Sequence, residues 1–438
     1  MKTPNTSNYR NRRVFLRRAA FAISAPFVVP ASVLGMANRA APSNRIGLAI
    51  LGLGDRGTQH ISGFAPLPEC QILAVCDVYR SKAEKYRAAV DQRYAQATAS
   101  DSYMGCTAYT DFREVLGRSD IDAVVITAPE NWHGIMASWA AKAGKDVYCE
   151  KALTLTVGEG RQLVEVIRNH GCILQVGTQQ RSDRNFRHAC ELARNGYLGN
   201  VHTIRVSVPG GRQLPAASPS PVPPDLDYDL WLGPAPWTPY SETKCTYNWY
   251  FMADYCAGWI QSWGVHHLDI ALWGVPKLAE GILTLKGTGV FPDKGMADTS
   301  IQWNVEALAP DGTKLIFTDD SQGKHGCRFE GDEGWVHVVR GGITAEPASL
   351  LSQTPRPGEL RLPESNHHQV NFLASIRSRR DPVSTVESGH AATTLSLIAD
   401  IATRSETTLL WDWRKEKFLR NESANRFLKR SFRSPWAM

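Results

Sequence analysis

Residues 45–57 decide the fold, and they read Arg-Ile-Gly-Leu-Ala-Ile-Leu-Gly-Leu-Gly-Asp-Arg-Gly. An apolar run of strand length leads directly into glycines spaced as GxGxxG. A helical stretch from Thr58 follows, and then a second apolar strand over 71–76 that ends at Asp77. Strand, glycine turn, helix, strand and terminal acid together are typical of a dinucleotide-binding unit. We expect the turn to bring backbone N–H groups to a pyrophosphate at a helix N-terminus.

Alternating strands and helices continue after this unit. Apolar strands are predicted over 121–127 and 145–149, with a helix over 134–143 between them. The alternation predicts a doubly wound parallel (Rossmann) sheet, in which ligands bind beyond the carboxyl ends of the strands. Side chains at these ends are therefore candidate cofactor ligands. They are Gly52, Gly54, Asp55, Arg56, Gly57, Asp77, Thr127, Pro129, Asn131, His133, Glu150 and Lys151.

The acid at the end of the second strand indicates which dinucleotide is bound. Asp77 can accept hydrogen bonds from ribose hydroxyls, and its charge repels a 2′-phosphate. NAD is therefore favoured over NADP. Arg80 lies close enough in sequence to keep NADP as the less favoured alternative.

The N-terminus has the pattern of a targeting segment. Residues 1–37 hold six Lys and Arg and no acid, which accounts for the whole formal net charge of +6. Arg12 and Arg13 precede an apolar run, which resembles a twin-arginine export signal and predicts a periplasmic or secreted protein. A membrane-anchoring N-terminus is the alternative. No later stretch has about 18 consecutive apolar residues, so no stable membrane span is expected.

Length and composition indicate a globular protein of two or three domains. The chain has 438 residues, of which 43% are hydrophobic and 21% charged. We divide it into a signal peptide (1–37), an NAD-binding domain (38–170) and a substrate and oligomerisation domain (171–438). The mature part is neutral overall, so no nucleic acid partner is expected. The nine cysteines form no CxxC pair, so no metal is predicted and no disulfide pairing is indicated.

The second half predicts an α+β domain with a large, mostly antiparallel sheet. Strand-like runs occupy 202–208, 282–285, 300–303, 314–318 and 334–339. Helices over 369–376 and 391–404 are expected to pack back on the first domain. The proline-rich segment 209–240 is either a surface loop or a cover for the pocket.

The segment 262–269 reads Ser-Trp-Gly-Val-His-His-Leu-Asp and is the strongest signal in the second half. His266 and Asp269 are three residues apart and would share a helix face. A helix cap and a buried core histidine are the plain alternatives to a catalytic role. We predict Lys151, His266 and His267 as catalytic residues and leave open which of them is the base.

Two motifs resemble the Gfo/Idh/MocA oxidoreductases, relatives of glucose–fructose oxidoreductase and inositol dehydrogenase. They are Thr-Ala-Pro-Glu-Asn-Trp-His at 127–133 and Val-Tyr-Cys-Glu-Lys at 147–151. The family usually has Glu-Lys-Pro at this point, and Ala152 replaces the proline in this chain. The resemblance implies that His266 and Asp269 match the family's catalytic segment. The family often has an acid four residues before the histidine, and this chain has Ser262 at that position. We place Gln180, Arg181 and Asp269 on the substrate side.

Three functions are compatible with these residues. The first is an exported NAD-dependent sugar or polyol oxidoreductase that carries its cofactor tightly bound, since no exchangeable pool is expected outside the cytoplasm. The second is a redox-neutral glycoside hydrolase or lyase that acts through a transient keto-sugar, as some relatives in the resembled family do. The third is a nucleotide-bound sensor, against which Lys151 argues. A homo-oligomer and a carbohydrate substrate are expected in the first two cases.

Overall fold

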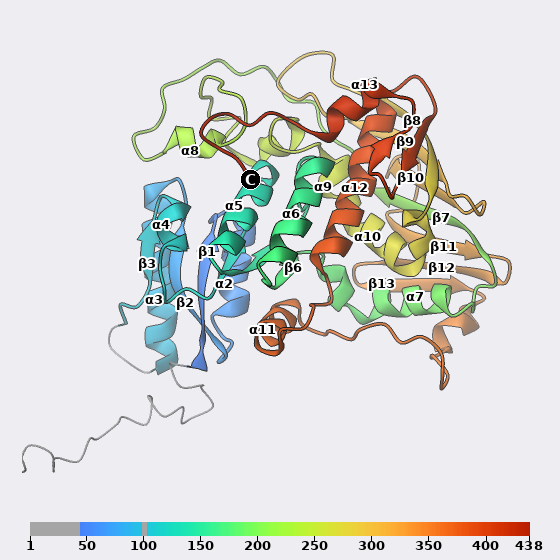
Figure 1. Ribbon diagram of the computed structural model, residues 1–438, viewed down its shortest axis with the longest axis horizontal. Coiled ribbons are helices and arrows are strands. Elements are labelled where there is room, and N and C mark those ends of the chain that lie inside the picture. The colour runs from blue at the N-terminus through green and yellow to red at the C-terminus, as the bar shows by residue number, and fades with distance from the viewer. Residues whose placement is uncertain (1–43, 99–102) are drawn as a thin grey trace, which may run out of the picture. The chain divides into compact units, whose positions relative to one another are not determined.

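A parallel sheet of six strands forms the first layer of the computed structural model, which describes residues 44–98 and 103–438 (Figure 1). The predicted signal peptide lies outside the described residues. The strand order is β3-β2-β1-β4-β5-β6. The strands are β1 (Ile46–Leu51), β2 (Cys70–Cys76), β3 (Thr107–Tyr109), β4 (Ala123–Ile126), β5 (Asp146–Cys149) and β6 (Leu174–Val176). Helices cover both faces, so β1, β4 and β5 are buried throughout, and this burial explains their unbroken apolar runs.

The helices of this layer connect successive parallel strands. They are α2 (Asp55–Phe64), α3 (Arg80–Thr98), α4 (Phe112–Leu116), α5 (Glu130–Lys142) and α6 (Val157–Asn169). The predicted doubly wound fold is confirmed. The boundary predicted at residue 170 falls one strand too early, because β6 pairs with β5 at the edge of the parallel sheet.

The second sheet has nine strands in the order β13-β12-β11-β7-β10-β9-β8-β14-β15. Its neighbours pair antiparallel except β7 and β10, which run parallel, so the predicted mostly antiparallel sheet is confirmed. The strands are β7 (Val201–Val208), β8 (Ile282–Val290), β9 (Gln302–Leu308), β10 (Lys314–Asp319), β11 (Gly326–Gly331), β12 (Gly334–Val339), β13 (Gly342–Glu346), β14 (Leu409–Asp412) and β15 (Lys417–Phe418).

Helices α7 (Arg184–Arg194), α10 (Gly264–Gly274) and α12 (Val386–Thr403) contribute to the hydrophobic core of the second sheet. Helix α10 is buried along its whole length. It lies between the sheet and α12 (Figure 1). Helix α11 (His368–Ser378) instead packs on the first layer, where the Phe372 ring contacts Phe64 and Tyr148. The C-terminal helices thus tie the two layers together.

The proline-rich segment 209–240 passes the loop that follows β2, at the carboxyl ends of the parallel strands. The Arg80 N–H donates to Asp225 O at 3.0 Å, and the Asp227 N–H donates to Val78 O at 3.0 Å. Leu230 and Trp231, in α8 (Tyr228–Leu232), reach the cavity described below. Of the two interpretations left open by the sequence, the structure favours the cover. We call 225–232 the strap.

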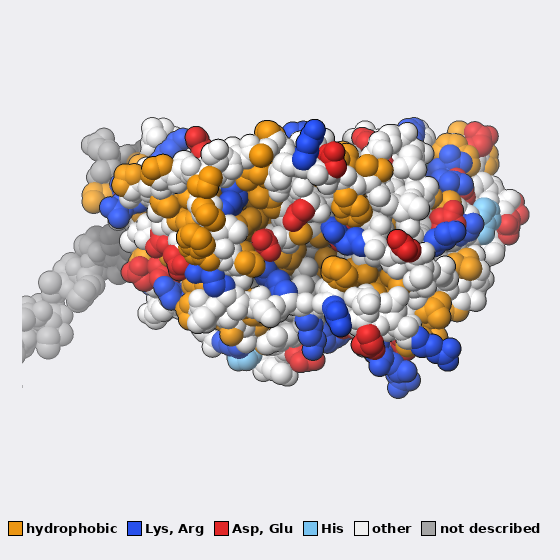
Figure 2. All heavy atoms as spheres, turned by 90° about the horizontal axis from the view of Figure 1, so that it is seen from above, with side chains coloured by type: hydrophobic (Ala, Val, Ile, Leu, Met, Phe, Trp, Pro, Cys, Tyr) orange, Lys and Arg blue, Asp and Glu red, His pale blue; other side chains and the backbone are white. Residues whose placement is uncertain are grey.

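The surface carries charges of both signs. Lys, Arg, Asp and Glu side chains are interspersed on the face seen in Figure 2, with apolar side chains between them. Each of the nine cysteines is free in the structure. In the ranges 44–98 and 103–438, no helix is long and apolar enough to cross a membrane, and no three His, Cys, Asp or Glu side chains gather as a metal site.

Candidate active site

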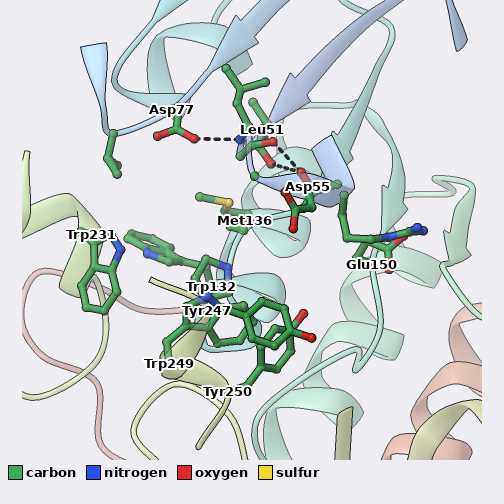
Figure 3. Close-up of a pocket in the computed structure, with 18 of the residues that line it drawn as sticks. Leu51, Asp55, Asp77, Trp132, Met136, Glu150, Trp231, Tyr247, Trp249 and Tyr250 are labelled. Carbon is green, nitrogen blue, oxygen red and sulfur yellow. Dashed lines mark hydrogen bonds and ion pairs between the residues drawn. The ribbon is translucent and has the colours of Figure 1, made fainter. Parts of the chain in front are cut away.

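One cavity of about 510 Å³ lies at the carboxyl ends of the parallel strands. The glycine turn and Asp77 form one side, and aromatic side chains form the other (Figure 3). The predicted residues that line it are Gly52, Gly54, Asp55, Arg56, Asp77, Thr127, Pro129, Glu150, Lys151 and His266. Residues predicted from strand ends and from the distant segment 262–269 therefore meet in one place.

The glycine turn fits a dinucleotide pyrophosphate. Gly52 has φ +94°, which favours glycine, and a Cβ on it would lie 2.8 Å from the Ala128 backbone nitrogen. A Cβ on Gly54 would meet no atom within 4 Å, so that backbone faces open space at the start of α2. Gly57 does not line the cavity. A Cβ there would lie 2.1 Å from Gly52 O, so its role is to let α2 approach the turn.

Asp77 lies where a ribose-binding acid is required. Its Oδ2 accepts from the Leu53 N–H at 2.8 Å, and its Oδ1 accepts from the Tyr79 N–H at 2.9 Å. Burial raises the pKa of this carboxyl, and Lys82 and the two N–H groups oppose the rise. The two backbone bonds fix the carboxylate at the wall of the cavity.

Asn131 and His133 do not line the cavity, so the structure does not bring them to the predicted cofactor site, and their cofactor contacts stay predictions. Trp132 and Met136 are four residues apart on α5 and share its cavity face. The Asn131 amide instead donates to Leu232 O at 3.3 Å, which holds the strap. The His133 ring nitrogens lie 2.7 Å from Ala152 O and 2.8 Å from Ala128 O, so His133 fixes the loops after β4 and β5.

Glu150 is a buried carboxylate whose hydrogen bonds are all made within the protein. It accepts from Arg56 at 2.6 Å and from Gln179 at 3.1 Å, and His60 Nε2 lies at 2.8 Å. Burial disfavours its charge, but Arg56 and His60 together hold the pKa of Glu150 well below its usual range. A Cβ on Gly177 would lie 2.9 Å from this carboxyl, so glycine is required there. Glu150 therefore positions Arg56 at the cavity wall.

Lys151 joins the two layers at the cavity. Its Nζ donates to Ser262 Oγ at 2.8 Å and lies 3.1 Å from Ser262 O, at the end of α9 (Trp259–Ser262). The Ser262 hydroxyl in turn donates to Glu130 Oε1 at 2.9 Å. The sequence prediction missed Glu130, because an acid in the first turn of a helix usually serves only the helix dipole. Its contact with Ser262, 132 residues away, is tertiary and leaves no local signal.

The two neighbouring histidines of α10 have different surroundings. His266 lines the cavity, and burial followed by the charges of Lys151 and Arg340 lowers its pKa well below the usual value. His267 is fully buried away from the cavity, with Nε2 3.5 Å from Gln180 Nε2 and its ring beside His325. His267 therefore does not reach the cavity, since successive helix positions point in different directions, and its catalytic role stays a prediction.

His267 should make stability depend on pH. Burial, then His325 and Arg340, lowers its pKa well below 6.5, so the unfolded chain binds more protons there below pH 6.5. As the pH is lowered below 6.5, the free energy of unfolding should therefore decrease. This residue contributes up to about 1.4 kcal/mol per pH unit. His267→Gln should reduce the slope by that amount in urea titrations at pH 4.5–7. Exposed His202→Gln is the control, and equal slopes for wild type and His267→Gln would contradict the assignment.

Arg181 and Asp269 form a buried ion pair instead of the predicted substrate contacts. Arg181 Nε and Nη2 donate to the two Asp269 oxygens at 2.7 and 2.8 Å, and Asp269 is fully buried. Arg181 also lies over the Trp273 ring. Gln180 is likewise buried, beside His267. None of the three residues lines the cavity, so their contacts here are structural and their substrate roles stay predictions.

Aromatic side chains form the wall opposite the glycine turn. Three of them lie in the short helix η3 (Tyr247–Phe251), which the sequence did not indicate. Tyr250 lies with its ring centroid 5.7 Å from Lys151 Nζ, and it stacks on Trp249. Figure 3 shows this wall, made by Trp132, Trp231, Tyr247, Trp249 and Tyr250. Flat apolar faces with a few polar groups are typical of small-molecule sites.

Comparison with protein families matches both layers. A model described as "Oxidoreductase family, NAD-binding Rossmann fold" matches residues 46–178. A second, described as "Oxidoreductase family, C-terminal alpha/beta domain", matches residues 208–438. Residues 179–207, which include α7 and most of β7, lie between the two matched regions.

Curated relatives match less of the chain. Myo-inositol 2-dehydrogenase of Thermotoga maritima is 30% identical over 181 residues, which are 41% of this chain and 47% of that protein. Glycosyl hydrolase family 109 protein 1 of Shewanella sp. (strain MR-4) is 32% identical over 175 residues, 35% of this chain and 36% of that protein. The matched regions thus span half or less of these relatives.

Solved structures share the whole fold. The scyllo-inositol dehydrogenase of Lactobacillus casei, solved with NAD(H) and scyllo-inositol, superposes with a TM-score of 0.58. The superposition covers 84% of this chain and 99% of that one, at 19% identity. At this identity the likeness concerns the fold.

Proposed function

This chain belongs to the Gfo/Idh/MocA oxidoreductase family, and we propose that it is an exported oxidoreductase of sugars or polyols that keeps NAD bound. One observation carries the proposal. The amine of Lys151 lies in the same cavity as the glycine turn and the ribose-binding acid Asp77. A proton acceptor thus adjoins a dinucleotide site, which is what oxidation of a carbinol requires.

The residues of this chain would hold NAD and move one proton. When bound, NAD supplies the hydride acceptor. The Gly52–Gly54 turn would hold the pyrophosphate and Asp77 the ribose. Lys151 would take the proton of the substrate hydroxyl, and the Ser262 hydroxyl orients its amine. His266, uncharged at neutral pH because of its lowered pKa, can hydrogen-bond a second hydroxyl. The aromatic wall excludes water and packs on the apolar face of a sugar ring.

The strap supports the retention of NAD. The Ser81 N–H donates to Asp225 Oδ1 at 2.9 Å, and the Ser81 hydroxyl donates to Oδ2. The Trp132 indole donates to Leu230 O at 3.1 Å. The C-terminal segment reinforces the strap, since Arg433 pairs with Asp229 at 2.5 Å. Release of a cofactor from beneath the strap would require these contacts to open.

Asp77→Ser should change the choice of dinucleotide. The loss of the carboxylate removes repulsion of a 2′-phosphate, and Lys82 already lines this end of the cavity. We expect the ratio of NADP to NAD affinity to rise by at least about tenfold, roughly 1.4 kcal/mol. Calorimetric titration of cofactor-stripped protein with each dinucleotide measures the ratio. Exposed Asp332→Ser is the matched control, and an unchanged ratio for Asp77→Ser would place the ribose elsewhere.

A redox-neutral glycoside hydrolase or lyase is the second candidate. The match to a glycosyl hydrolase family 109 protein favours it. In that reaction, transient oxidation of one hydroxyl acidifies the neighbouring C–H, and the glycosidic bond breaks by β-elimination. The electron pair returns to the sugar at the end, so no reduced cofactor accumulates.

One experiment tests the proposal and separates the two candidates. The full chain is expressed with its N-terminus, and the cofactor is released by denaturation from protein purified from the exported fraction. Stoichiometric NAD, with keto-sugar and NADH formed from a panel of polyols and sugars, supports the oxidoreductase. Cleavage of glycosides without net NADH supports the second candidate. Cofactor-free protein inert on the whole panel with added NAD would contradict both.

The proposed export route is tested by a separate variant. Replacing Arg12 and Arg13 with lysine should retain the protein in the cytoplasm if the twin-arginine interpretation is correct. Immunodetection in cell fractions measures this. Export of the variant at the wild-type level would contradict that route.

A further inference from the structure

Glu130 is a buried carboxylate to which the described residues supply no direct counter-ion. It is 1% exposed, at the start of α5. Two other buried glutamates of the same domain are neutralised by arginine, Glu150 by Arg56 and Glu159 by Arg430, each at 2.6 Å. Within the described residues, no Lys, Arg or His forms an ion pair with Glu130. Burying a charge without a partner is costly, so its surroundings need an explanation.

The surroundings of Glu130 lead to one amine. Its Oε1 accepts from the Ser262 hydroxyl at 2.9 Å, and that hydroxyl oxygen accepts from Lys151 Nζ at 2.8 Å. Its Oε2 is buried and finds no hydrogen-bond donor in the described part of the chain. Burial raises the pKa of the Cys256 thiol nearby, and the charge of Glu130 raises it further. The negative charge is therefore linked to Lys151 through a single hydroxyl.

We infer that Glu130 is the acid that works with Lys151, and that Ser262 connects them. Where the resembled family often has an acid, this chain has Ser262. The Ser262 hydroxyl donates to the carboxylate of Glu130, which lies one hydrogen bond further from Lys151. The inference rests on the proposed function of this cavity. Glu130 is then a positioning residue that acts on the substrate through Lys151.

The connection allows a balanced proton transfer. Lys151 Nζ would pass a proton to Ser262 Oγ while the Ser262 hydroxyl proton passes to Glu130 Oε1. The freed amine would then take the O–H proton of the substrate carbinol, and NAD, when bound, would accept the C–H hydrogen with its electron pair. The net result is one carbonyl product and one proton on Glu130, with Lys151 and Ser262 restored.

The test compares Glu130→Gln, Ser262→Ala, their double variant, and Glu130→Gln combined with Ser262→Asp. Reaction of Lys151 with acetic anhydride at a fixed alkaline pH, followed by peptide mass spectrometry, needs no substrate. Glu130→Gln removes the negative charge that lies one hydroxyl away from Lys151 Nζ, so the amine should be acetylated several-fold faster than in wild type. Glu191→Gln is the matched control, a buried glutamate remote from the cavity that accepts from the Leu362 N–H.

Turnover gives the second readout. Glu130→Gln and Ser262→Ala should each lower kcat about 100-fold with KM within about threefold. The double variant should lose no more than either single one, because both changes interrupt the same path. Ser262→Asp should restore at least about tenfold in the Glu130→Gln background. Any folding defect would appear in the bound-cofactor content of each variant.

Two results would overturn the inference. Acetylation of Lys151 at wild-type rate in Glu130→Gln would show that the carboxylate does not act on the amine. Wild-type kcat in both single variants would show that the path carries no proton. A wild type inactive on every substrate would instead contradict the proposed function, and the acetylation comparison would still decide the role of Glu130.

Discussion

Lys151→Met should lower kcat by about 10³-fold or more while NAD stays bound. Methionine keeps the length and apolar stem of the side chain and removes only the amine. Lys151 Nζ donates to the Ser262 hydroxyl, which donates to Glu130. Among the described residues, no other cationic group at the cavity has this connection. The glycine turn and Asp77 are untouched, so stoichiometric NAD should be recovered from the denatured variant.

The control for this variant lies on α5. Lys142→Met changes an exposed lysine at the end of that helix and should leave kcat at the wild-type value. A Lys151→Met enzyme that retains more than about a tenth of wild-type kcat would assign proton transfer to His266 instead. His266→Asn would then be the variant that abolishes turnover.

Asp269→Asn should destabilise the fold by about 3–5 kcal/mol. The change leaves Arg181, which is 9% exposed, without a counter-charge and removes one of two charge-assisted hydrogen bonds. The pair connects the segment after β6 to α10, so the loss falls on the junction between the two layers. Urea unfolding followed by fluorescence should show a lower midpoint.

The matched variant removes both charges together. Replacing Arg181 with methionine and Asp269 with leucine should recover much of the lost stability, because no unpaired charge stays buried. KM of the Asp269→Asn enzyme should stay within about threefold of wild type. Wild-type stability with a large rise in KM would restore the substrate role that the sequence predicts for Asp269.

The parallel sheet and the nucleotide half of the site could be predicted from local sequence. A strand, a GxGxxG turn and a terminal acid occupy adjacent positions, so the fingerprint from Ile46 to Asp77 is complete in one short stretch. The predicted end of the first domain precedes β6, although residues 172–177 are themselves strand-like, because the pairing of β6 with β5 has no local signal. A short strand joins a sheet by tertiary pairing, which the sequence does not display.

The predicted helix residues that do not reach the cavity share one physical cause. Neighbouring residues of one helix turn point in different directions, so Pro129 and His266 reach the cavity while Asn131, His133 and His267 do not. Glu130 was missed for the complementary reason, since its partner Ser262 is distant in sequence. Segments such as η3 carry aromatic residues whose placement depends on how the strap and α9 pack.

The most direct test follows the hydrogen itself. Purified protein with its own bound cofactor is incubated with polyols and sugars deuterated at their carbinol carbons, and the released cofactor is analysed by mass spectrometry. We expect deuterium in the nicotinamide ring for wild type with at least one substrate, and none for Lys151→Met. NAD bound stoichiometrically but free of deuterium across the whole panel would contradict an oxidoreductase site in this cavity.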